Sequence, residues 1–182
     1  MCRKVMMFTI SEIKITPRWL TSREANQIET ELKSTPNILG YTAGELQHFP
    51  NVLVAETPSG EFAGACISKD LLFNWTDIAM LYVLPKFRGY GIGGKLFREA
   101  FARAQARRRH IYVLSRNPSV IRLMEQSEMK IARAAWQAPL ALHLYNQYHM
   151  SSLYRLSEAI RKSRMRRDDG QRFVAATKRY EP

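Results

Sequence analysis

Residues 81–96 read LYVLPKFRGYGIGGKL, and this stretch decides the fold. The preceding residues 75–84 are apolar enough for a central strand, which Pro85 ends because a central strand cannot accommodate a residue without an N–H group. Glycines then remove side chains where the chain turns into a helix. The first N–H groups of a helix have no internal partners and can bind a phosphate, and the helix dipole favours the anion. Arg88 and Lys95 add positive charge nearby. The stretch therefore predicts a pyrophosphate cradle.

Several classes of protein use such a cradle. A P-loop would need Ser or Thr where this chain has Leu96, so that interpretation fails at the residue that would bind magnesium. A dinucleotide fingerprint fits the spacing of Gly89, Gly91 and Gly94, but no acidic residue follows the next strand. An arginine that recognises NADP would keep that alternative open. A glycine-rich turn without a ligand also stays open.

The residues Arg88-Gly89-Tyr90-Gly91-Ile92-Gly93 match the pattern R/Q-x-x-G-x-G/A. In this respect the chain resembles the GNAT superfamily of N-acetyltransferases, whose acyl-CoA pyrophosphate loop has this pattern. The stretches EFAGACISK (residues 61–69) and HIYVLSRNPSVIRLMEQSEM (residues 110–129) resemble the third and fifth strands of that family. The resemblance covers roughly residues 51–136.

The resemblance implies an enzyme that transfers an acetyl group from acetyl-CoA, as co-substrate, to a primary amine, without a metal. Pantetheine would lie between the fourth and fifth strands, and a backbone N–H near Val83 would polarise the acyl carbonyl. The implied cofactor-binding residues are Leu81, Tyr82, Val83, Arg88, Gly89, Tyr90, Gly91, Ile92, Gly93, Gly94 and Asn117.

The resemblance also bears on the groups that transfer protons. The resemblance places the general base at Asp77, although an Asp at a strand end can also be solvated or cap a turn. Even spacing predicts that Asp77 and residues 79, 81 and 83 share one face of the strand. Many relatives protonate the leaving thiolate with a Tyr, which here is Met124. Tyr112 or Tyr145 would then have to serve, CoA would leave unaided, or activity would be weak.

The chain departs from that family pattern at two further positions. It has Glu128 where the family has Gly, and Met129 where the family has Phe. A catalytically weak acyl-CoA sensor or a nucleic-acid-binding module with this fold is therefore the alternative function.

The periodicity predicts a mixed α/β fold with a central sheet and flanking helices. We expect a single GNAT-like domain over residues 1–182, with residues 137–170 inserted as helices before the last strand. The expected strands are residues 10–15, 51–56, 61–69, 75–84, 110–115, 130–136 and 172–180. The expected helices lie within residues 21–33, 42–49, 88–109, 117–129 and 139–167. A capping box, Thr21 with Glu24, begins the first helix.

Charge is the unusual feature of the composition. The chain of 182 residues has 28 Lys and Arg against 16 Asp and Glu, a formal net charge of +12. Such an excess attracts polyanions, so nucleic-acid binding stays open, as does a homodimer. The amine acceptor is not encoded in any motif. With no secretory signal or membrane span in the sequence, we expect a cytoplasmic protein.

Overall fold

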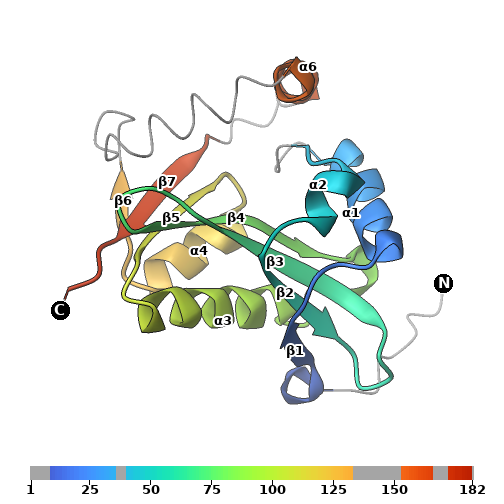
Figure 1. Cartoon of the computed structure of the whole chain (residues 1–182), viewed down its shortest axis with the longest axis horizontal. Coiled ribbons are helices and arrows are strands. Elements are labelled where there is room, and N and C mark those ends of the chain that lie inside the picture. Colours follow the sequence, from blue (N-terminus) through green and yellow to red (C-terminus); the bar gives the residue numbers. More distant parts are fainter. Residues whose placement is uncertain (1–8, 36–39, 133–152, 166–171, 182) are drawn as a thin grey trace.

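The computed structural model describes residues 9–35, 40–132, 153–165 and 172–181. A seven-stranded mixed sheet forms its centre, in the order β1-β2-β3-β4-β5-β7-β6 (Figure 1). The strands are β1 (Lys14–Pro17), β2 (Asn51–Glu56), β3 (Phe62–Asp70), β4 (Trp75–Val83), β5 (His110–Ser115), β6 (Lys130–Ala132) and β7 (Val174–Lys178). Among the described strands, only β4 and β5 pair in parallel. The predicted mixed α/β fold is confirmed.

Helices cover both faces of the sheet (Figure 1). They are α1 (Ser22–Ser34), α2 (Ala43–Gln47), α3 (Ile92–Ala106), α4 (Pro118–Gln126) and α6 (Leu153–Met165), with 3-10 turns η1 (Ile10–Glu12) and η2 (Pro85–Phe87). The capping box at Thr21 is confirmed, because Thr21 N donates to Glu24 Oε2 at 2.8 Å. No described helix is long and apolar enough to cross a membrane.

The predicted strand over residues 10–15 is wrong in its first half. Ile10–Glu12 forms η1, and β1 begins only at Lys14. The reason is local: Thr9 N donates to Glu12 Oε2 at 2.6 Å, which closes a turn instead of an extended segment. The parts of the expected strand 130–136 and helix 139–167 that fall at residues 133–152 and 166–167 lie outside the described residues.

Helix α3 packs its predicted apolar face on the sheet. Phe97, Ala100, Phe101 and Ala104 recur at helical spacing, and all four are buried. A helix with this pattern gains most of its stability from burying such a face. The packing fixes the first turn of α3 against β4.

An extra residue in β4 disturbs its pairing with β3. Ser68 lies opposite Ile78 and Ile67 lies opposite Met80, so Ala79 has no partner of its own in β3. Such a bulge bends a strand and increases its local twist. The parallel pairing of β4 with β5 ends just before the bulge, where Asp77 lies opposite Tyr112. Residues 78–83 therefore continue without pairing to β5, and we call this unpaired stretch between β4 and β5 the gap.

The bulge also corrects the prediction that Asp77 shares a face with Leu81 and Val83. Asp77 lies opposite Lys69, whose Nζ is 4.7 Å from the Phe49 ring beside α2. Leu81 and Val83 instead face the first turn of α3. A single extra residue reverses the alternation of side chains along a strand, because that alternation has a period of two. The Asp77 carboxyl group thus belongs to the face that carries α1 and α2.

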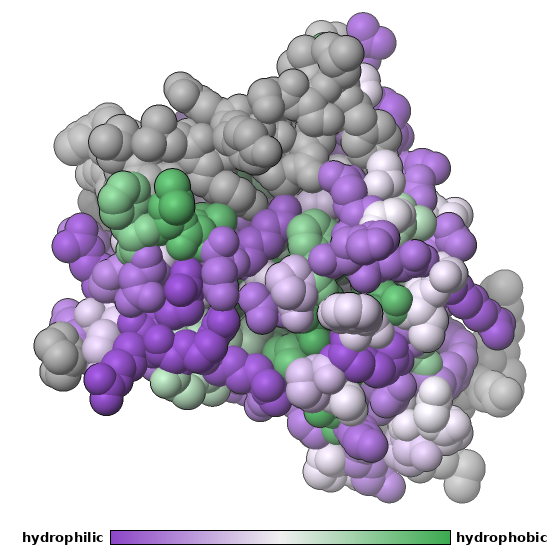
Figure 2. All heavy atoms as spheres, in the orientation of Figure 1, coloured by the Kyte–Doolittle hydropathy of each residue, from purple (hydrophilic) through white to green (hydrophobic). Residues whose placement is uncertain are grey.

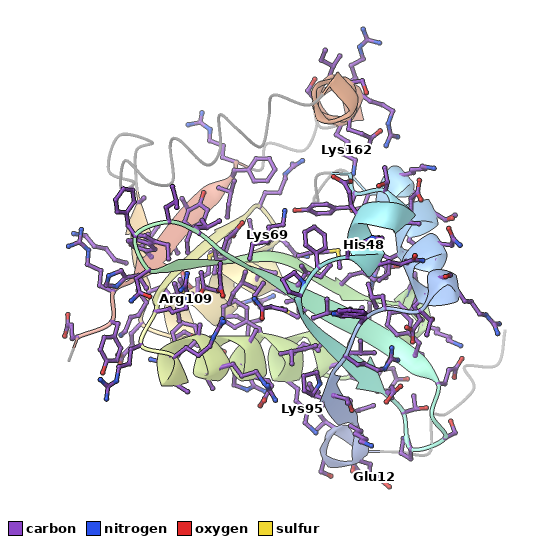
Figure 3. All side chains as sticks on the ribbon, viewed as in Figure 1. Glu12, His48, Lys69, Lys95, Arg109 and Lys162 are labelled. Atoms are coloured by element: carbon purple, nitrogen blue, oxygen red, sulfur yellow. The ribbon has the colours of Figure 1, made fainter. Side chains whose placement is uncertain are left out.

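Helix α6 is anchored on the carboxyl end of α1. Lys162 is 1% exposed and its Nζ donates to the carbonyl of Leu32 at 2.8 Å, while Arg161 Nη1 donates to the carbonyl of Lys33 at 2.8 Å. Figure 3 shows Lys162 extending from α6 toward α1. The last carbonyl groups of a helix lack internal partners and attract cations. Lys162 and Arg161 therefore supply hydrogen-bond donors and positive charge at the end of α1.

We predict that Glu128→Gly raises the stability of the protein. Glu128 follows α4 with φ 52°, a left-handed conformation, and Met129 N donates to the carbonyl of Met124 at 3.0 Å, as at many helix ends that have Gly there. Relief of this strain is worth about 1 kcal/mol, or roughly 2–4 °C in Tm, measured by thermal unfolding. Glu128→Ala is the matched control, since it loses the ion pair with Lys178 but keeps the strain. Equal Tm values for the two variants would contradict the prediction.

Candidate active site

The gap between β4 and β5 presents backbone groups of β4. Leu84 N donates to the carbonyl of Ala63 in β3 at 3.0 Å, so Leu84 directs its backbone toward β3. Backbone groups alternate in direction along an antiparallel strand, so Tyr82 also faces β3, whereas Leu81 and Val83 face the gap. Leu81 and Val83 are therefore placed to bond an extended ligand as a neighbouring strand would.

The glycines between β4 and α3 form a turn with the backbone geometry that the predicted cradle requires. Gly89 and Gly91 have φ of 87° and 79°, conformations that other residues rarely adopt, and Gly91 is the N-cap of α3. Lys95 N makes the first helical bond, to the carbonyl of Gly91. The amide groups of residues 92–94 precede that bond and are available to an anion. A Cβ on Gly93 would lie 3.6 Å from Val83 Cγ2, so this turn lies beside the gap.

Lys95 does not serve the cradle as the sequence suggested. Its Nζ donates to the carbonyl groups of Ile10, Ser11 and Ile13 at 3.2, 3.3 and 2.5 Å. Figure 3 shows this side chain beside η1 and β1. A lysine at the fourth position of a helix can reach either the anion site or a neighbouring segment, and only the folded arrangement decides between them. Here Lys95 holds the N-terminal segment against α3.

Arg98 is a cation near the cradle that the sequence reasoning missed. A Cβ on Gly94 would lie 3.2 Å from Arg98 Nη1, so the guanidinium group folds back over the first turn of α3. The sequence could have indicated this position, because Arg98 follows Gly94 at i,i+4 spacing and a glycine leaves room for a long side chain. Arg88, the other cation of the motif, donates from Nε to the carbonyl of Val83 at 3.0 Å. The cradle is therefore flanked by two guanidinium groups.

Asp77 is buried, with 6% of its surface exposed, where β4 and β5 begin to separate. Lys69 faces it from β3 and lies over the rings of Tyr41 and Phe49, at 4.7 Å from each centroid. Tyr112, also buried, lies opposite Asp77 in β5. Asp77, Lys69 and Tyr112 thus occupy neighbouring positions on three adjacent strands, on the α1–α2 face. Lys69 was not identified from the sequence.

The other candidate proton donors differ in position. Met124, at the family's usual Tyr position, is fully buried in the core, so α4 supplies no donor there. Tyr145 lies outside the described residues. The side chain of Tyr82 is buried on the α1–α2 face, and this burial, with the Glu31 carboxylate nearby, raises the pKa of Tyr82 to about 12. Its hydroxyl group is protonated at neutral pH.

Two remaining residues complete the surroundings of the gap. Asn117 follows β5 and caps α4, with its side-chain oxygen accepting from Ser119 N at 2.9 Å. Burial, aided by the Asp77 charge, raises the pKa of the Cys66 thiol to about 12, so this thiol is not a nucleophile at neutral pH. Among the described residues, no group of three or more His, Cys, Asp or Glu could hold a metal ion.

The sequence matches the acetyltransferase (GNAT) family over residues 17–128, more than half of the chain. The chain therefore belongs to the GNAT family of acyl-CoA-dependent N-acyltransferases. The match runs from the last residue of β1 to just beyond α4 and includes the bulge, the gap and the cradle. No curated protein is similar enough in sequence to match the chain.

Solved structures share the fold. N-acetylglutamate synthase from Neisseria gonorrhoeae, complexed with coenzyme A and N-acetyl-glutamate, is similar over 93% of this chain at 15% identity and a TM-score of 0.64. This chain spans 35% of that protein's length. Rv2747 from Mycobacterium tuberculosis, in complex with CoA, is similar over 88% of this chain and 97% of its own, at 16% identity and a TM-score of 0.61. YncA from Salmonella typhimurium, with acetyl-CoA, covers 65% of this chain and 80% of its own, at 18% identity and a TM-score of 0.53.

We predict that Lys95→Met lowers the stability of the protein and that Arg98→Met does not. Lys95 bonds three backbone carbonyl groups, and the loss of a charged donor of this kind costs about 1.5–3 kcal/mol. Arg98 is exposed on the same helix, so its replacement costs little. Urea unfolding of both variants measures the difference. A Lys95→Met protein as stable as the wild type would show that these bonds contribute nothing.

Proposed function

We propose that this chain transfers an acetyl group from acetyl-CoA to a primary amine, with Asp77 as the general base. The observation that carries the proposal is the position of the cradle. The first turn of α3 lies against Val83, at the mouth of the gap where β4 leaves β5 unpaired. The amides of residues 92–94 would bind the pyrophosphate, and the backbone of Leu81 would bond the pantetheine arm.

Different groups of the chain would carry out the separate steps of the reaction. The Val83 amide would stabilise the developing oxyanion. Asp77, which lies six residues before Val83 on β4, would accept through a chain of water molecules the proton that the amine loses as it attacks the acyl carbon. The carbon–sulfur bond then breaks and CoA leaves. Tyr112, opposite Asp77, is the described phenol best placed to return a proton to the sulfur. No comparison supports the alternative of a sensor or a nucleic-acid-binding module.

An acceptor that carries a carboxylate fits the α1–α2 face. Lys69 lies opposite Asp77 in β3, on the same face of the sheet, and its ammonium group would bind an acidic group of the acceptor. The Neisseria gonorrhoeae structure, which holds N-acetyl-glutamate together with coenzyme A, makes amino acids the first acceptors to screen. Peptide N-termini, lysine side chains and polyamines complete the panel.

We further propose that residues 1–182 form one acyltransferase domain in which residues 137–170 are an insertion beside the acceptor side. Helix α6, the described part of that segment, is held on the carboxyl end of α1 by Lys162 and Arg161. The α1–α2 face is also the face that carries Asp77 and Lys69. The insertion would therefore border the path of the acceptor.

We predict that calorimetric titration shows micromolar binding of acetyl-CoA and that Gly91→Glu abolishes it. The glutamate would repel the phosphates and fill the cradle. Gly91→Ala is the matched control because it adds the same left-handed strain, while its Cβ would meet only Ile10 at 3.7 Å. Arg98→Met should weaken binding roughly fivefold, and Lys95→Met should not.

Two results would oppose this assignment. Absence of acetyl-CoA binding to the wild type would overturn the proposed function. Binding of NADPH in its place would favour the dinucleotide interpretation of the same glycines.

We predict that Asp77→Asn lowers kcat by about 10²–10⁴-fold and leaves the Kd of acetyl-CoA unchanged, because the amide cannot accept the proton. CoA release, followed with a thiol reagent, measures the rate with the best acceptor of the panel. Raising the pH should partly restore the kcat of the variant, since more of the amine is then deprotonated without a general base. Full activity of Asp77→Asn would remove Asp77 from the mechanism.

A further inference from the structure

Two apolar side chains protrude at the turn between β3 and β4. Leu72 and Phe73 are 73% and 71% exposed, the highest values among the large apolar side chains of the described residues. Figure 2 shows the corresponding hydrophobic cluster, in green beside purple side chains, at the end of the sheet where Figure 1 places this turn. Exposed pairs of large apolar residues that are fixed in place commonly mark an interaction surface.

The turn is held rigidly in an unfavourable conformation. Phe73 and Asn74 have φ of 53° and 62°, a geometry in which Asn or Gly is common and Phe is rare. Arg109 Nη2 donates to the carbonyl of Leu71 at 3.1 Å, and Asn74 Nδ2 donates to the carbonyl of Arg108 at 2.7 Å. The surrounding structure thus fixes a strained, exposed phenylalanine, and strain maintained in this way points to a function.

Positive charge surrounds the turn. The ladder pairs Trp75 with His110 and Ile111 with Lys178, which brings the ends of α3 and β7 to the same end of the sheet. The cations there are Arg107, Arg108, Arg109, Lys178 and Arg179. The acidic residues there are Asp70, which pairs with Arg107 and Arg109, Glu128, which pairs with Lys178, and the exposed Glu181. Cations therefore remain in excess, in keeping with the net charge of +12.

We propose that the β3–β4 turn docks the protein on an anionic phospholipid surface. Leu72 and Phe73 have no polar side-chain atom, and they lie at the tip of a hairpin. Such a tip enters a deformable acyl layer more readily than it forms the broad, complementary contact of about 800 Å² per partner that a stable protein interface needs. One short apolar anchor binds a membrane weakly, so a second, electrostatic attraction is required, and the arginines around the turn supply it.

This docking is separate from the proposed acetyl transfer. The cradle lies at the first turn of α3 and the arginine cluster follows its last turn, so about 20 Å of helix separates them. A protein held at the turn would keep the cradle open to solution. Acetyl-CoA binding and membrane binding can therefore succeed or fail independently.

The test is co-sedimentation of the full chain with vesicles of phosphatidylcholine and phosphatidylglycerol, and with vesicles of phosphatidylcholine alone. We expect binding to the anionic vesicles that weakens as salt rises. The double substitution Leu72→Ser with Phe73→Gly should lower the partition coefficient about 100-fold, roughly tenfold for each lost apolar group. Glycine accepts the left-handed conformation at residue 73, so this variant should fold. Arg108→Gly, also at positive φ, should reduce both binding and its salt dependence.

The matched control is Trp19→Ser, which removes an equally exposed apolar side chain from the loop between β1 and α1, and it should bind like the wild type. Three results would each overturn the proposal. The first is that the wild type fails to bind the anionic vesicles at low salt, and the second is that the double variant binds them as tightly as the wild type. The third is that the double variant elutes from a size-exclusion column as a smaller species than the wild type. The last result would show that the turn joins two copies of the chain. Circular dichroism of every variant verifies the fold.

Discussion

Ala79 is the residue on which the site depends, because it gives β4 one more residue than the facing part of β3. The bulge twists β4 away from β5 immediately after Asp77 pairs with Tyr112. Two consequences follow from this single irregularity. Leu81 and Val83 present their backbone groups to an open gap, and Asp77 lies on the opposite face of the sheet from their side chains. A regular strand would have closed the gap and placed all three side chains together.

The cations of α3 show how little the residue type alone decides about function. Lys95 and Arg98 follow the same glycines, and either side chain is long enough to reach a phosphate. Lys95 instead bonds three carbonyl groups of the N-terminal segment, whereas Arg98 folds over the first turn of the helix. The choice depends on what packs against each side of α3, and η1 packs on the side of Lys95.

Cations that bond helix carbonyl groups also attach helix α6 to helix α1. Lys162 and Arg161 of α6 bond the last carbonyl groups of α1, far away in sequence. The burial of Lys162 is tolerable because its ammonium group meets both a carbonyl oxygen and, at 3.7 Å, the carboxylate of Glu158. The α1–α2 face, where we place the acceptor, is therefore supported by a helix that the family match, which ends at residue 128, does not include.

The sequence by itself determined the order of strands and helices, the capping box of α1 and the glycine turn before α3. These features rest on local chemistry, namely hydrophobic period, turn residues and helix-end hydrogen bonding. The tertiary structure alone decided the bulge at Ala79, the face on which Asp77 lies, the partners of Lys95 and the position of Lys69 opposite Asp77. Each of these depends on register between segments that are distant in sequence. Register follows from packing of the whole sheet, and one inserted residue reverses every side chain beyond it.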